Sequence, residues 1–182
     1  MNFIFRILLT FNATSLLVIV YLVQQEITLD LIDSSAYGIP SAYSNTISYI
    51  SYLLLPVTLT WLSLLLCRLL GKDSFSEKSI VSIEHANNSF LPSYLGYFFV
   101  ALSINNIETL IFVYGLLFVF TFQSQALYFN PIFLVFKYEF YNITTNSGAS
   151  IFLISKKRYK LPREVVINEA WRINNYTFIA KE

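Results

Sequence analysis

Long apolar segments without charged residues dominate the first 130 residues of the chain. The first covers residues 7–25, and the second covers residues 47–66. Two more, at 90–104 and 109–127, lie on either side of a short polar turn. A membrane-spanning helix needs about 20 predominantly apolar residues, because no water is present to bond its backbone. The pattern therefore predicts four transmembrane helices within residues 1–130.

Two of these segments admit a second interpretation. The first follows Arg6, as the apolar region of a signal peptide would, but no small-residue cleavage pattern precedes Gln24 and Gln25. We therefore expect the first segment to be a retained span. The third segment is short for a bilayer, which leaves open whether it crosses fully or is partly re-entrant.

Pro56 lies near the middle of the second predicted span. Proline lacks a backbone N–H, so it frees the carbonyl one turn earlier and predicts a kink. The hydroxyls of Ser51 and Thr60 are placed to bond backbone groups that the proline disturbs. A gating hinge at Pro56 is the alternative interpretation.

The pattern changes after Asn130-Pro131, where aromatic and β-branched residues begin to alternate. Residues 133–144 predict a strand with one period-2 apolar face, and residues 150–155 predict the strand that returns. Residues 145–148, Thr-Asn-Ser-Gly, supply the turn between them. The part of the chain that follows the spans therefore opens with a β-hairpin.

The fold class that follows is an α-helical integral membrane protein with a small β-containing (α+β) domain, residues 131–182. Within this domain residues 162–172 fit a helix or a strand, and residues 176–180 predict a last strand. A domain of this size is small for an independent core. We expect it to pack against residues 68–89, a neighbouring subunit or a soluble partner.

The positions of Lys and Arg predict the orientation of the chain in the membrane. Lys and Arg near the ends of spans stay on the cytoplasmic side. All 12 occur before the first span, between the second and third, or after the fourth. The two opposite loops carry only acids: Glu26, Asp30, Asp33 and Glu108. We therefore expect a multi-pass protein of the bacterial inner membrane with both termini and residues 131–182 in the cytoplasm.

Composition argues against an ordinary soluble enzyme, because 55% of the residues are hydrophobic and only 13% are charged. One cysteine, Cys67, and one histidine, His85, leave no disulfide framework and no metal-ligand cluster. Phosphate-binding, metalloprotease and serine-hydrolase motifs are also missing from the sequence. We expect no catalytic activity and no cofactor, with His85 a solvated loop residue rather than a general base.

The region after the spans carries eight basic residues against four acids, a local charge of +4. Its densest run is Lys156, Lys157, Arg158 and Lys160. Contact with anionic lipid explains such a run beside a membrane more simply than direct nucleic-acid binding. Together with Arg163 and Trp171, the run is our candidate surface for a partner or for lipid.

Polar residues within the spans have two interpretations. Thr60 and Ser63 in the second span, with Gln123 and Gln125 in the fourth, suit interhelical hydrogen bonds or the lining of a pore. Glu108, at the outer turn, suits the capping of the following helix or an ion-binding ring.

The arrangement of four spans, Asn130-Pro131, an aromatic strand, the turn at 146–148 and a strand over residues 151–157 resembles the KwaA family. This family is the membrane subunit of the bacterial two-gene Kiwa antiphage system. The resemblance covers nearly the whole chain and implies an inner-membrane homo-oligomer, a tetramer. It also implies a soluble DNA-binding partner, KwaB, on the cytoplasmic side, and it transfers no catalytic residue.

The resemblance implies a membrane sensor and scaffold that passes a signal of phage attachment to its partner. One alternative is an oligomeric pore that depolarises the membrane, lined by the polar residues named above. Another is a membrane anchor or assembly factor without a switch.

Overall fold

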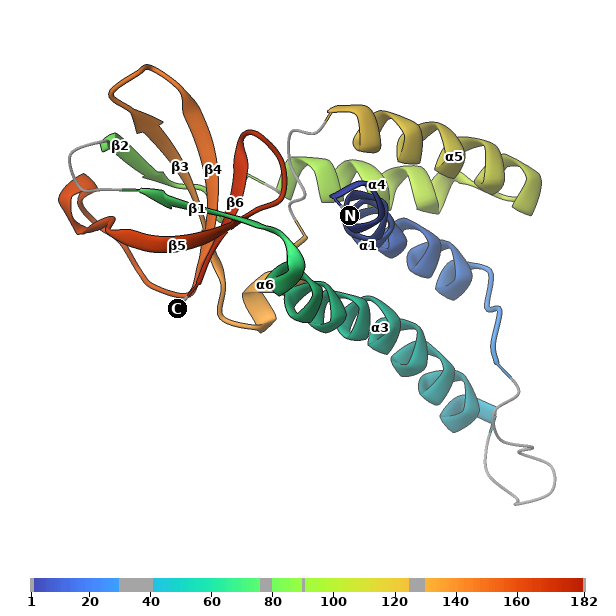
Figure 1. Cartoon of the computed structure of the whole chain (residues 1–182). Coiled ribbons are helices and arrows are strands. Elements are labelled where there is room, and N and C mark those ends of the chain that lie inside the picture. Colours follow the sequence, from blue (N-terminus) through green and yellow to red (C-terminus); the bar gives the residue numbers. More distant parts are fainter. Residues whose placement is uncertain (1, 30–40, 76–79, 90, 125–129, 182) are drawn as a thin grey trace.

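The computed structural model describes residues 2–29, 41–75, 80–89, 91–124 and 130–181. Long helices form one end of the molecule and a β-sheet forms the other (Figure 1). The long helices are α1 (Asn2–Gln24), α3 (Ser41–Leu66), α4 (Leu91–Ser103) and α5 (Ile107–Ser124). The strands are β1 (Gly71–Phe75), β2 (Ile80–His85), β3 (Glu139–Thr145), β4 (Ser150–Ser155), β5 (Ile167–Arg172) and β6 (Thr177–Ala180). Short helical turns are η1 (Cys67–Leu69), α6 (Ile132–Val135) and η3 (Pro162–Glu164).

Helix α1 is the centre of the helical end and contacts α3, α4 and α5. Phe5, Leu9, Ala13, Leu17 and Tyr21 are all buried, at a spacing of four residues. Residues four apart lie on the same face of a helix, so these side chains form one continuous buried stripe. The first two pack with the sheet and the last two with α4 and α5, which joins the two ends of the molecule.

Three helical segments are long and apolar enough to cross a membrane: Phe3–Gln24, Asn45–Leu69 and Ile107–Ser124. The predicted third span corresponds to α4, which has 13 residues. At 1.5 Å per residue α4 is about 20 Å long, against about 30 Å of hydrocarbon in a bilayer. Length and composition therefore support three of the four predicted spans, and the crossing of α4 stays a prediction.

Two of the observed helices begin before the predicted spans. Helix α1 begins at Asn2 and α3 at Ser41, before the predicted starts at 7 and 47. A span predicted from an uncharged run starts after the nearest charge or polar turn, whereas helical hydrogen bonding continues through Arg6 in α1 and through the polar residues at the start of α3. Residues 90 and 125–127 of the third and fourth predicted spans lie outside the described residues.

Helix α3 continues through Pro56 as a single helix. The Ser51 hydroxyl donates to the Ile47 carbonyl and the Thr60 hydroxyl donates to the Pro56 carbonyl, at 2.8 and 2.7 Å. Neither bond reaches the carbonyl of Tyr52, which is the one that the proline frees. A hinge at Pro56 stays a prediction.

The sheet has the order β1-β5-β6-β4-β3-β2. Only β4 and β6 pair in parallel, and the other neighbours are antiparallel. The predicted β-hairpin is confirmed, because β3 and β4 pair from Glu139 with Ser155 to Thr144 with Ser150. Gly148 has φ +79°, the left-handed conformation that suits glycine in such a turn. The predicted last strand is confirmed as β6.

The segment 68–89, predicted to be a loop, contains the two edge strands β1 and β2. Its mixture of charged, small and apolar residues gives little local strand signal. Both strands are stabilised by pairing with distant segments instead, β1 with β5 and β2 with β3. The expected packing of the C-terminal region against this segment is confirmed.

The prediction of a strand over residues 133–144 is wrong in its first half, because Ile132–Val135 forms the short helix α6. Asn130 Oδ1 accepts the Ile132 N–H at 3.0 Å, which favours a helical start. Lys137 then turns the chain at φ 64°, and the strand begins at Glu139. Residues 162–172, left open between helix and strand, form the turn η3 followed by β5.

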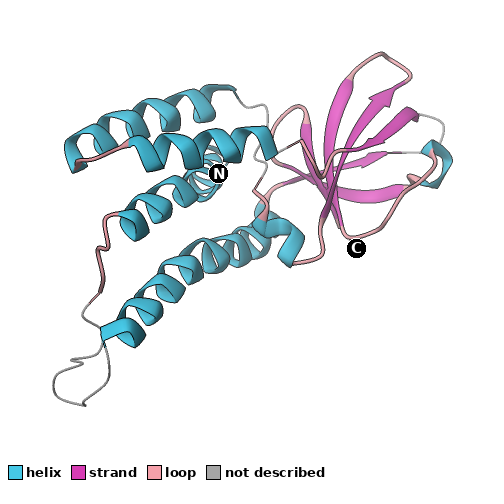
Figure 2. Ribbon diagram, turned by 180° about the vertical axis from the view of Figure 1, so that it is seen from behind, coloured by secondary structure: helices cyan, strands magenta, loops and turns pink. Residues whose placement is uncertain are grey.

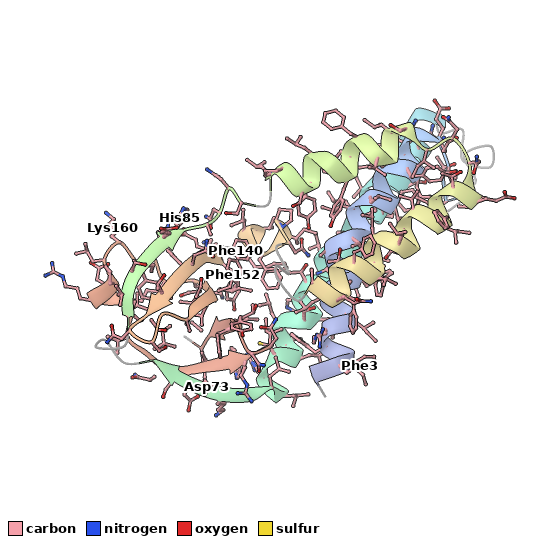
Figure 3. All side chains as sticks on the ribbon, turned by 90° about the horizontal axis from the view of Figure 1, so that it is seen from above. Phe3, Asp73, His85, Phe140, Phe152 and Lys160 are labelled. Atoms are coloured by element: carbon pink, nitrogen blue, oxygen red, sulfur yellow. The ribbon has the colours of Figure 1, made fainter. Side chains whose placement is uncertain are left out.

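The central strands are buried on both faces. In β4, Phe152 and Ile154 pack with the helical end, whereas Ile151 and Leu153 pack in a second cluster on the other face. Figure 3 shows Phe140, like Phe152, between the sheet and the helices. Strict alternation between two apolar cores explains why the sequence of β4 is almost continuously hydrophobic.

The sheet is strongly curled. Five Cα steps join Phe75, at the end of β1, to Ile80, at the start of β2, and can span about 18 Å at most. Edge strands of a flat six-stranded sheet would lie about 24 Å apart, so the two edges must approach each other at this end. In Figure 1, β5 accordingly runs across the view while β3 and β4 run up it, and Figure 2 shows the same curl from behind.

Candidate interaction surface

The predicted basic run forms an exposed segment directly after β4. Lys156, Lys157 and Arg158 are all exposed. The next residue, Tyr159, is buried, and its backbone N–H donates to the Tyr141 hydroxyl at 3.2 Å. The buried tyrosine holds the segment against the sheet, so that its charged neighbours face solvent.

Lys160 and Arg163 follow this segment and are also exposed. Figure 3 shows Lys160 and His85 on the outside of the sheet, away from the helices. Arg163 belongs to η3, which contacts β2. Glu164 Oε2 accepts the Lys160 N–H at 2.8 Å, and such backbone hydrogen bonds hold the pKa of the Glu164 carboxyl below its usual value. This bond fixes the backbone that carries Lys160.

A carboxylate that the sequence analysis did not single out organises the base of this surface. Glu139 begins β3, and its side chain is only 13% exposed. Its Oε2 accepts a hydrogen bond from the Tyr141 hydroxyl at 2.9 Å and lies 3.3 Å from His85 Nε2. Its Oε1 accepts a hydrogen bond from Arg158 Nε. His85 therefore ends a strand and contacts an acid, rather than lying in a solvated loop.

The protonation of this cluster follows from its contacts. Partial burial acts to raise the pKa of Glu139, but the hydrogen bonds from Tyr141, Arg158 and His85 outweigh it and lower the pKa overall. Burial raises the pKa of Tyr141 to about 12. At neutral pH the carboxylate is ionised and the phenol is neutral, so the cluster acts as an ion-pair network that positions Arg158. Within the described ranges, no three His, Cys, Asp or Glu side chains gather as a metal site requires.

Two pockets on this surface share Glu139 and Arg158. One, of about 540 Å³, extends to His85 and Lys160, and the other extends to Lys156. Four cations line these two pockets, and we call them the basic face: Lys137, Lys156, Arg158 and Lys160. Glu139, with its lowered pKa, is the acid at the centre of this face.

A third pocket continues from Lys156 toward the helices. Trp171 of β5 and Trp61 of α3 line it together with Arg68. We call it the boundary pocket, because it lies where α3 meets the sheet. The structure thus brings Trp171 together with Lys156, whereas Lys160 and Arg163 do not line this pocket.

The polar residues predicted within the spans do not form one group in the described chain. Thr60 and Ser63 are buried in α3, and the Asn12 amide of α1 donates to the Thr60 hydroxyl at 2.7 Å. Gln123 is exposed near the end of α5, and Gln125 lies outside the described residues. Thr60 thus makes an interhelical hydrogen bond.

Glu108 is exposed in the first turn of α5. The side chain that caps this helix belongs to Asn106, whose Oδ1 accepts the Thr109 N–H at 2.8 Å. Glu108 contributes its charge at the positive end of the helix, where a carboxylate is favourable.

Replacing Glu139 with glutamine is expected to lower the free energy of unfolding by about 1 kcal/mol at pH 7. A carboxyl whose pKa is lowered in the folded state stabilises the fold above its ordinary pKa, and this stabilisation is lost as the pH falls through the folded value. The difference between Glu139→Gln and the wild type should therefore shrink below a pH of about 4.5. Thermal unfolding of both proteins in mild detergent at pH 7 and pH 4 measures this difference in stability.

Glu84→Gln is the matched control, because Glu84 is exposed on the neighbouring strand β2. A stability difference for Glu139→Gln that stayed constant from pH 7 to pH 4 would contradict the assigned role of the carboxylate.

Comparison with known proteins leads to one family. Neither the curated proteins nor the solved structures contain a match to this chain. The family model described as anti-phage protein KwaA matches residues 5–179, which include the helices, the sheet and the basic face. The chain therefore belongs to the KwaA family of anti-phage proteins, as the resemblance in its sequence predicted.

Proposed function

We propose that this chain is the membrane-embedded sensor and scaffold of an antiphage defence complex, and that it recruits a soluble DNA-binding partner to its cytoplasmic face. Membership of an anti-phage family supports the defence role. The observation that supports recruitment is the basic face, where four cations surround one carboxylate. Direct nucleic-acid contact is assigned to the partner and not to this chain.

Three apolar helices support an integral membrane location, for which we propose the bacterial inner membrane. Phe5, near the start of α1, packs in the same core as Ile179 of the last strand, so both ends of the described chain lie at the sheet end. Arg6 and Arg68 lie at this end as well, and the positive-inside rule then orients it toward the cytoplasm.

Exposed apolar side chains on α5 support a homo-oligomer, for which we propose a tetramer. Ile111, Phe112 and Phe120 are 60–72% exposed, and so little of α5 is covered that it faces either lipid or a neighbouring copy. An assembly of several copies would present several basic faces on one side of the membrane. Such repetition strengthens the binding of a partner that is itself oligomeric.

The exposure of the basic face suits a charged partner. Arg158 has an 82% exposed side chain, although Glu139 fixes its orientation. Exposed charges mainly steer association and select partners of complementary sign. We therefore propose that the soluble partner presents an acidic surface to Arg158 and Lys160.

Co-purification with the soluble protein of the neighbouring gene tests this function. We expect the wild-type chain, solubilised in mild detergent, to recover that protein as a stoichiometric complex. Arg158→Gln with Lys160→Gln should weaken binding about tenfold or more, because two complementary charges are lost.

Lys72→Gln with Lys181→Gln is the matched control, since both lysines pair with Glu169 and neither lines the basic face. It removes the same charge and should leave binding unchanged. Recovery of a clean oligomer without the soluble protein would count against recruitment, and ion conductance in liposomes would then favour a pore. Equal binding by both double variants would refute the assigned surface.

A further inference from the structure

The boundary pocket joins an apolar helix to a charged sheet. Its volume is about 430 Å³. On one side α3 contributes Trp61, Leu64 and Leu65. On the other side η1, strand β5 and the residues next to β3 and β4 contribute charged and aromatic side chains: Arg68, Trp171, Tyr138 and Lys156. One wall is therefore apolar and the other is cationic.

The two cations of this pocket contrast with four others at the sheet end. Arg158, Arg172, Lys72 and Lys181 each form an ion pair with a carboxylate. In the ranges that the structure describes, neither Arg68 nor Lys156 has a carboxylate within ion-pair distance. The Lys156 ammonium instead lies over the ring of Tyr138, 5.0 Å from its centroid. Two uncompensated positive charges that line one pocket favour an anionic occupant.

The position of the pocket along α3 identifies the kind of anion. The apolar segment long enough to span a membrane ends at Leu69, so Arg68 lies at its boundary. Trp61 lies two turns before this end and is 55% exposed, and Leu65 lies one turn before it and is 37% exposed. Tryptophan is enriched where hydrocarbon meets headgroups, and Lys or Arg at this depth attract anionic lipid. The apolar wall is thus continuous with the surface that acyl chains would contact.

We propose that the boundary pocket binds the phosphate group of an anionic phospholipid. Arg68 and Lys156 hold the phosphate oxygens, and the acyl chains lie along the exposed face of α3 that carries Trp61 and Leu65. This site does not depend on recruitment of a soluble partner. It depends only on α3 lying in the bilayer.

Tryptophan fluorescence offers a direct test, because the chain has two tryptophans and both line this pocket. The full chain in mild detergent is titrated with phosphatidylglycerol or phosphatidylcholine whose acyl chains carry bromine, a quencher of nearby tryptophan. We expect phosphatidylglycerol to quench at a concentration about tenfold lower than phosphatidylcholine, since two cations contribute to its binding. Equal quenching by both lipids in the wild-type chain would overturn the proposal without any variant.

Two double variants locate the site. Arg68→Gln with Lys156→Gln should abolish the preference for phosphatidylglycerol. Lys72→Gln with Lys181→Gln removes the same charge outside the pocket and should retain the preference. If the first variant kept the preference, the proposed site would be wrong.

Soluble phosphate is distinguished from lipid by competition. Unbrominated phosphatidylglycerol should reverse the quenching, whereas glycerol 1-phosphate at the same concentration should not. Reversal by glycerol 1-phosphate at equal concentration would show that the occupant is a soluble phosphate and would overturn the lipid assignment. Because wild-type protein is used, this result does not depend on whether a variant folds.

Discussion

Replacing Phe140 with alanine is expected to lower the free energy of unfolding by about 3–5 kcal/mol, because a fully buried phenyl ring leaves a cavity. Phe140 is 0% exposed, and its ring is stacked on that of Phe152 with centroids 5.7 Å apart. Its ring also lies near that of Phe133 of α6, with centroids 6.2 Å apart. The three rings belong to the core between the sheet and the helices. Removing one of them should therefore weaken the packing of both ends of the molecule.

Thermal unfolding in detergent measures this effect, and the midpoint should fall by about 10 °C. Tyr176→Ala is the control, because it removes an aromatic side chain that is 60% exposed beside the same sheet. The control should shift the midpoint by little. A similar small shift for Phe140→Ala would mean that the core between sheet and helices does not carry the stability assigned to it.

The helical end is predictable from the sequence because its signal is local. A run such as residues 7–25 is apolar over a bilayer length, and no distant residue is needed to interpret it. The hairpin of β3 and β4 is predictable for a similar reason, since its two strands are joined by a turn containing Gly148. Local signals failed at Ile132–Val135, where aromatic and aliphatic residues of strand-like composition form a short helix whose first N–H bonds the Asn130 side chain.

Strands β1 and β2 show what local signals miss. Lys72 lies opposite Trp171, and Glu84 lies opposite Asn142, so both strands pair with residues more than 50 positions away. The charged residues that indicate a loop in the sequence face solvent on edge strands, where charge is common. Only the assembled sheet makes these segments extended.

The candidate surface was predictable in part. The run beginning at Lys156 is visible in the sequence because its charges are contiguous. The carboxylate that organises it was not, since Glu139 meets His85 only through the pairing of β2 with β3, and meets Arg158 through β4. The boundary pocket was missed for the same reason, because Arg68 and Lys156 are 88 residues apart in the chain.

Replacing Thr60 with valine is expected to lower the free energy of unfolding by about 2–3 kcal/mol, although valine has nearly the same shape. The Thr60 hydroxyl accepts hydrogen bonds from the side-chain amides of Asn12, at 2.7 Å, and Asn130, at 3.2 Å, and donates to the Pro56 carbonyl. All three side chains are buried. Valine would leave two buried amide donors without their acceptor, and the desolvation of each is then uncompensated.

The same substitution should also loosen the sheet from the helices, because Asn130 begins the segment that leads through α6 into the sheet. Its Oδ1 accepts the Ile132 N–H, so an amide that has lost Thr60 is free to turn away and release this N–H at the start of α6. Hydrogen exchange in detergent should therefore show faster exchange at 132–135 in Thr60→Val, alongside the lower midpoint of thermal unfolding. Thr60→Ser retains the hydroxyl and removes only a methyl group, so it should keep both values close to the wild type. If Thr60→Val were as stable as Thr60→Ser, with no faster exchange at 132–135, the shared hydrogen bonds would not be what joins α1 and α3 to the start of the sheet.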